Sequence, residues 1–154
     1  MASLSDYLES GLLQHIFRSG EFPKPSGMAV CLTSAAPLDS DTGETMLEIP
    51  SGINGSGTGY SRIDLGTPTE SGNQKWAHTA ERILEGSGVI GNSGAFIWDT
   101  ALVDWGWVSG IALCDTANYA SGNLLMHAQL DNPRIIYTGD SVKFDADALQ
   151  ISFD

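Results

Sequence analysis

The sequence predicts a mainly β domain, an antiparallel β-sandwich or jelly roll with one amphipathic helix at its N-terminus. Two observations lead to this fold class. From Met28 onward, apolar and polar residues alternate in seven or eight short stretches, separated by residues that favour turns. Only the segment at the start of the chain clearly repeats its apolar residues at helical spacing. Many short strands with turns between them are typical of sandwiches and jelly rolls.

The N-terminal helix is predicted by apolar residues that recur every four positions. These residues are Leu4, Leu8, Leu12 and Ile16. The residues Ser3 to Asp6 fit a loose capping pattern, and Gly20 followed by two prolines ends the helix. We therefore expect a helix within residues 1–20. Its apolar stripe packs either on the domain's own sheet or on a neighbouring subunit.

Strands are expected where the period of two is clearest. The predicted stretches are 28–33, 60–65, 95–98, 105–114, 123–130, a pair at 135–137 and 142–144 around a Gly139-Asp140 turn, and 149–153. The segment Asn73 to Glu85 fits both a helix and a strand pair, and strand is slightly favoured. Nothing divides the chain, so residues 1–154 are expected to form one domain.

A long polar segment, Pro37 to Gly59, interrupts this pattern. It is rich in Asp, Ser, Gly and Thr and contains one short apolar stretch, Met46 to Ile49. Loops of this length are uncommon in compact domains and are often functional or mobile. We expect an extended loop or arm.

Charge and cysteine content exclude several classes of protein. Seven Lys and Arg stand against nineteen Asp and Glu, for a formal net charge of -12, so direct contact with nucleic-acid phosphates is unfavourable. No apolar run reaches about 18 residues, so no membrane span is predicted. The N-terminus lacks the basic start of a signal peptide. Cys31 and Cys114 are expected to be buried free thiols, with a disulfide between them as the less favoured alternative.

No combination of residues predicts catalysis, a metal site or a cofactor. His15, His78 and His127 have no neighbours at metal-ligand spacing. The acidic DSDTGE stretch at 39–44 departs from the calcium-loop pattern at Gly43 and Glu44. The glycines at 55, 57 and 59 precede a strand, whereas a phosphate-binding loop precedes a helix. We therefore expect neither an enzyme nor a required metal.

Three tryptophans crowd within ten positions, at Trp98, Trp105 and Trp107. Such aromatic residues fill a core or a subunit interface more often than they form a sugar-stacking platform. Together with the helix stripe they give a set of candidate interface residues: Leu4, Leu8, Leu12, Ile16, Trp98, Trp105 and Trp107. This apolar surface also predicts self-association, with a trimer as the expected state.

Several motifs follow one another along the chain in a recognisable order. They are Ser5 to Glu9 with Leu12 to Phe17, Met28 to Pro37, Gly59 to Arg62, Asp104 to Val108, Gly122 to Leu125, Gly139 to Phe144 and Ala148 to Phe153. In this order they resemble a family of short tailed-bacteriophage virion proteins. Members are often labelled tail fibre proteins, and some similar small β proteins are capsid cement or decoration proteins. The longer, more acidic segment from Pro37 to Gly59 departs from the usual pattern.

The resemblance implies a structural virion protein that assembles in the host cytoplasm. We favour a capsid cement or decoration protein that binds the major capsid protein on the outer surface of the assembled shell and stabilises it. The net charge supports an exterior position, away from packaged DNA. The alternative is a tail or tail-fibre component that binds tail proteins. A carbohydrate-binding module that uses the tryptophans is a third hypothesis.

Overall fold

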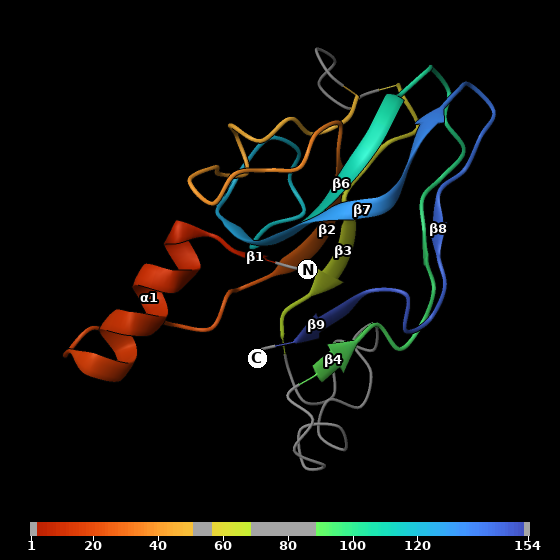
Figure 1. The fold of residues 1–154 in the computed structure, drawn as a ribbon. Helices are drawn as coiled ribbons and strands as arrows, with labels where there is room; N and C mark the ends of the chain where they lie inside the picture. Colours follow the sequence, from red (N-terminus) through yellow and green to blue (C-terminus); the bar gives the residue numbers. More distant parts are fainter. Residues whose placement is uncertain (1–2, 51–56, 69–88, 153–154) are drawn as a thin grey trace.

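The computed structural model describes residues 3–50, 57–68 and 89–152 (Figure 1). It confirms a mainly β fold with one N-terminal helix. A five-stranded antiparallel sheet has the order β1-β7-β6-β2-β3, and two small sheets pair β4 with β9 and β5 with β8. The elements are β1 (Ser3–Leu4), α1 (Asp6–Phe17), β2 (Met28–Thr33), β3 (Ile63–Gly66), β4 (Val89–Gly91), β5 (Phe96–Ile97), β6 (Gly106–Cys114), β7 (Leu124–Ile136), β8 (Lys143–Phe144) and β9 (Gln150–Ser152).

Strand β2 lies inside the five-stranded sheet, between β6 and β3. Every residue from Ala29 to Thr33 is buried, so both faces of the strand are covered. Val30 and Leu32 belong to the main core, whereas Cys31 packs in a second cluster with Met46, Ala112, Cys114 and Leu124. Burial on both faces explains why this strand is apolar almost throughout.

Aromatic side chains hold the main core together. Trp98 and Phe144 meet edge to face with ring centroids 5.9 Å apart, and Tyr60 and Trp105 do so at 5.6 Å. Phe96 is paired with Phe144 across β5 and β8. These contacts join the small β5–β8 sheet to the rest of the core, because Phe96, Trp98 and Phe144 all pack in the main cluster.

Helix α1 is attached to the sheet through its first turn. Ser5 is the N-cap: its hydroxyl accepts a hydrogen bond from the Leu8 amide at 3.3 Å and donates one to the Leu124 carbonyl of β7. Leu8 is buried, and Leu4 and Leu12 are half-buried against the main core. Three residues of the predicted stripe, Leu4, Leu8 and Leu12, therefore contact the domain's own core, and helix α1 projects away from the sheet (Figure 1).

The described part of the segment from Pro37 to Gly59 is folded against the sheet. The Ile49 amide donates to the Leu32 carbonyl at 3.1 Å, and the Gly43 amide donates to the Gly122 carbonyl at 2.9 Å. Met46, Glu48, Ile49 and Pro50 are buried. Sequence composition missed this packing because the residues that hold the segment come from distant parts of the chain.

Two expected strands at 123–130 and 135–137 are one long strand, β7, which passes through Pro133. Gly110 of β6 is opposite Gln129, but Val108 is opposite Arg134, so β7 bulges at residues 130–133. The expected turn is present, because the Asp140 amide donates to the Tyr137 carbonyl. After the turn the chain crosses to pair with β5 rather than returning along β7. The ambiguous segment at 73–85 lies outside the described residues.

Candidate binding groove and exposed helix end

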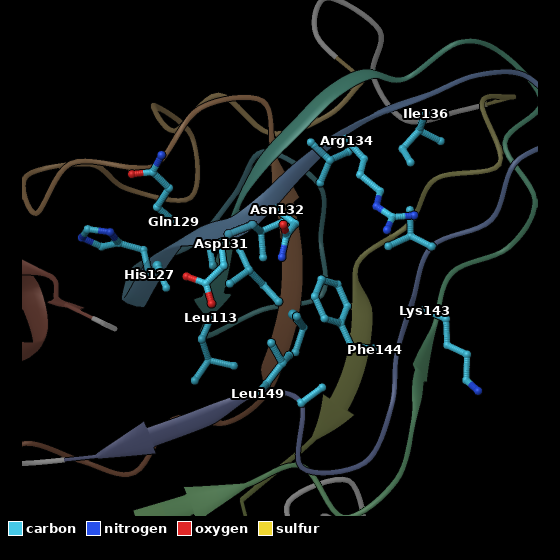
Figure 2. A pocket seen from close by; sticks show the side chains of 18 of the residues that line it. Leu113, His127, Gln129, Asp131, Asn132, Arg134, Ile136, Lys143, Phe144 and Leu149 are labelled. Atoms are coloured by element: carbon cyan, nitrogen blue, oxygen red, sulfur yellow. The ribbon is translucent and has the colours of Figure 1, made fainter.

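A groove of about 860 Å³ lies between β7 and the chain from Asp140 to Ile151 (Figure 2). Its volume is within the range of about 300–1,000 Å³ that is usual for ligand sites. Apolar side chains of both walls form much of its lining: Val30, Val108, Ile111, Leu113, Leu130, Phe144, Leu149 and Ile151. Because Leu130, Phe144, Leu149 and Ile151 are only partly buried, the groove exposes part of the core.

Four charged residues line this groove and balance one another: Asp131 and Arg134 on β7, Asp140 in the turn and Lys143 on β8. Lys143 pairs with Asp145 at 2.6 Å, and Asp140 accepts a hydrogen bond from the Tyr137 amide. Among the described residues, Asp131 and Arg134 have no ion-pair partner. Figure 2 shows the Arg134 side chain reaching away from β7 toward the segment that leads into β8.

The end of helix α1 carries a second unpartnered apolar surface. Leu13, Ile16 and Phe17 are 58%, 66% and 76% exposed. Their spacing of three and four residues places them on one face of the helix. We call these three residues the helix knob.

The chain after α1 folds back and packs against the helix. Phe22 meets Tyr7 edge to face at 5.7 Å, and a side chain at Gly11 would overlap the Phe22 ring. The Phe22 amide also lies 3.5 Å from His15 Nδ1. The helix and its returning chain therefore form one packed unit.

The predicted interface residues divide between core and surface. Leu8, Trp98 and Trp105 are buried within the chain, and Leu4 and Leu12 are half-buried against the core. Ile16 and Trp107 are exposed. Only these last two are fully available to a partner, and they lie on separate elements, α1 and β6.

The tryptophans do not form a shared platform. Trp98 is 2% exposed, and Trp105 is buried with its indole nitrogen donating to the Thr58 carbonyl at 2.9 Å. Gly106 has φ +77°, a left-handed conformation that suits glycine. It separates the buried Trp105 from Trp107, which is opposite Ile135 on β7.

The residues considered for metal binding serve structural roles. The Asp41 carboxylate accepts hydrogen bonds from the Leu38 amide and the Thr45 hydroxyl, which shapes a turn. His127 contacts Asp39 at 2.9 Å. Within residues 3–50, 57–68 and 89–152, no group of three or more His, Cys, Asp or Glu side chains is placed to hold a metal ion. His78 lies outside these residues.

A buried ion pair, which the sequence pattern did not reveal, joins Glu48 to Arg62 at 2.7 Å. Burial disfavours the charged guanidinium, but its hydrogen bonds to Glu48 outweigh this effect and hold the pKa of Arg62 above its usual value. Arg62 also donates to the carbonyls of Gly43, Thr116 and Ser121. This network connects the 37–50 segment to the β6–β7 connection, so its role is structural.

The two cysteines are buried free thiols on the neighbouring strands β2 and β6. Burial and the hydrogen bond with Cys114 raise the pKa of the Cys31 thiol well above its usual value. Since the thiolate is the reactive form, the Cys31 thiol is expected to react slowly. In the described part of the chain, no helix is long and apolar enough to cross a membrane.

Comparison with known families shows which family the chain belongs to. A family model described as podophage GP4 fiber I protein gp80 matches residues 3–152. The chain belongs to this family. No curated protein matches it. Membership confirms the resemblance to short tailed-phage virion proteins. It supports the tail-fibre alternative better than the capsid-decoration function favoured from the sequence.

Proposed function

We propose that this fibre-family chain is a structural component of a podophage tail, which acts by binding other virion proteins and not by catalysis. The match of the fibre I family model over residues 3–152 carries the proposal. Two unpartnered apolar surfaces, the helix knob and the groove, support a binding role because exposed apolar patches commonly mark interaction sites. The net charge of -12 fits a position away from DNA.

The partners we propose are other tail or fibre proteins, met during assembly in the host cytoplasm. A trimer is the expected oligomer, and no cofactor or metal is required. The capsid-decoration function has no separate support in the family match. The carbohydrate-binding hypothesis is weakened because Trp98 and Trp105 are buried and cannot stack on a sugar.

Electron cryo-microscopy of the whole particle tests the proposed position. We expect density for this fold on the tail, in a handful of copies, and mass spectrometry of purified particles gives the copy number independently. Hundreds of copies on the shell would overturn the tail assignment. Loss of folding on treatment with a chelator would contradict the absence of a required metal.

A further inference from the structure

We infer that the helix knob of one copy docks in the groove of a second copy. The knob is a protruding helix end with three exposed apolar side chains, and the groove is a hollow with apolar walls, so the two differ in shape as a projection and a receptacle do. Figure 1 shows α1 projecting on one side of the fold and β8 on the other, so the knob cannot fill the groove of its own chain. This inference concerns contact between copies and does not depend on where the protein sits on the particle.

The distribution of positive charge favours the knob and the groove as the surfaces through which two copies meet. Two copies of a chain with net charge -12 repel one another over most of their surfaces. The described residues include five cations, of which Arg62 is buried with Glu48. Of the other four, Arg18 directly follows the knob, Lys24 lies on the chain that returns along α1, and Arg134 and Lys143 line the groove.

The local charges of the knob and the groove do not repel one another, unlike the net charge of the chain. Residues 14–24 contain Arg18, Lys24 and Glu21, for a formal charge of +1 with His15 neutral. The groove contains Asp131 and Asp140 against Arg134 and Lys143, for a formal charge of zero. Arg18 directly follows the knob and lacks an ion-pair partner among the described residues, as does Asp131. An Arg18–Asp131 pair between copies would satisfy both.

The shape of β7 favours a helix over an added strand. Between Ala128 and Ile136, β7 has no outer neighbour among the described strands, since β1 pairs only with Met126 and His127. Pro133 and the bulge at 130–133 disrupt this edge, and both are devices that block strand addition. Packing the apolar face of a helix into a groove does not need a regular strand edge.

The contact is head to tail, because different surfaces of the two copies meet. Such contacts close into a ring when the rotation between copies allows it. A trimeric ring would use every knob and every groove. Because Phe22 already packs against Tyr7 and Gly11 in the single chain, less conformational entropy is lost when the knob docks.

Two variants test the contact in the full-length protein. The knob variant, Ile16→Ser with Phe17→Ser, removes two exposed apolar side chains. The groove variant, Ser141→Trp, fills the groove from an exposed position. We expect light scattering to show an oligomer for the natural chain and a monomer for each variant, with self-association weakened roughly 30-fold or more. Leu38→Ser, at a remote exposed apolar position, is the matched control and stays oligomeric.

Mixing the two variants separates a head-to-tail contact from a symmetric one. The knob variant keeps its groove and the groove variant keeps its knob, so an equimolar mixture forms a one-to-one dimer and nothing larger. A mixture that stays monomeric overturns the inference. So does a natural chain that is monomeric at every concentration, or a groove variant that assembles normally. Circular dichroism and a thermal melt establish that each variant is folded.

A charge exchange tests the register of the contact. Arg18→Glu and Asp131→Arg each weaken self-association by roughly two- to fivefold, and the double variant restores it. Failure of the double variant to recover affinity, when both single variants lose it, would exclude the Arg18–Asp131 pair.

Discussion

Arg62 and Glu48 are joined by three hydrogen bonds, of 2.7, 2.9 and 3.2 Å, and both side chains are almost completely withdrawn from solvent. The two residues come from different segments, so their pairing fixes the 37–50 segment relative to the strand that follows it. A buried charge that loses its partner cannot be solvated. The Arg62–Glu48 ion pair is therefore important for keeping the 37–50 segment packed on the fold.

Replacing Arg62 with Leu is expected to lower the free energy of unfolding by about 3–5 kcal/mol, because Glu48 is left buried without its partner. Urea denaturation measures the change. Lys24→Leu is the matched control, since Lys24 is exposed, and its effect should stay within about 0.5 kcal/mol. Equal effects of the two substitutions would contradict a structural role for the ion pair.

The buried phenol of Tyr60 is expected to make the folded protein less stable at alkaline pH. Burial, and then the nearby Cys31 and Glu48 groups, raise the pKa of the Tyr60 phenol well above 10.0. The folded chain then holds this proton more tightly than the unfolded chain does. Its contribution to stability is complete below pH 10 and is lost as pH rises from there through the raised pKa.

Denaturation at several pH values from 8 to 12 measures the decline in stability that Tyr60 causes. Tyr60→Phe should have a shallower slope above pH 10, although it is less stable at neutral pH because the hydroxyl bonds to Leu32 and Glu48 are lost. An unchanged alkaline slope in the Tyr60→Phe variant would show that other groups cause the decline.

Gly43 is expected to tolerate no side chain. A Cβ atom there would overlap the carbonyl oxygens of Ser121 and Gly122, which are backbone atoms that cannot rotate away. Gly43→Ala should cost about 1–3 kcal/mol. A Cβ atom at Gly94 meets open space, so Gly94→Ala should change stability by less than about 1 kcal/mol. Thermal unfolding compares the two, and similar melting temperatures would refute the packing argument.

Substitution of Trp98 and of Trp107 tests the assignment of one tryptophan to the core and the other to the surface. Trp98 is 2% exposed and Trp107 is 54% exposed. We expect Trp98→Ala to cost about 3–5 kcal/mol and Trp107→Ala to cost less than about 1 kcal/mol. Fluorescence quenching by iodide should fall after loss of Trp107 and persist after loss of Trp98. A larger loss of stability for Trp107→Ala than for Trp98→Ala would contradict the burial of Trp98 in the core.

The sequence predicts those elements whose pattern is local. The helix is specified by its apolar repeat and its Ser5 cap, and β2 and β6 by apolar residues at the period of two. Residues 123–137 show where local reasoning fails. Pro133 indicates a break, but the bulge accommodates a proline at the strand edge and β7 continues to Ile136.

Long-range pairing explains the other differences. A glutamate such as Glu48 is expected at the surface unless a partner such as Arg62, fourteen positions later, is known to lie beside it. Ile16 of the exposed knob belongs to the predicted apolar stripe, but no sequence pattern indicates where the sheet stops covering a helix. The groove has no sequence signal at all, because its walls are separate segments that meet only in the folded chain.

The bulged edge of β7 also affects how the chain behaves at high local concentration. Sheets held close together at high local concentration are prone to amyloid-like stacking through unprotected edges. Pro133 lacks the amide that such stacking needs, and the bulge at 130–133 breaks the regular spacing. Copies of this chain can therefore come close together without their sheets merging into aggregates through this edge.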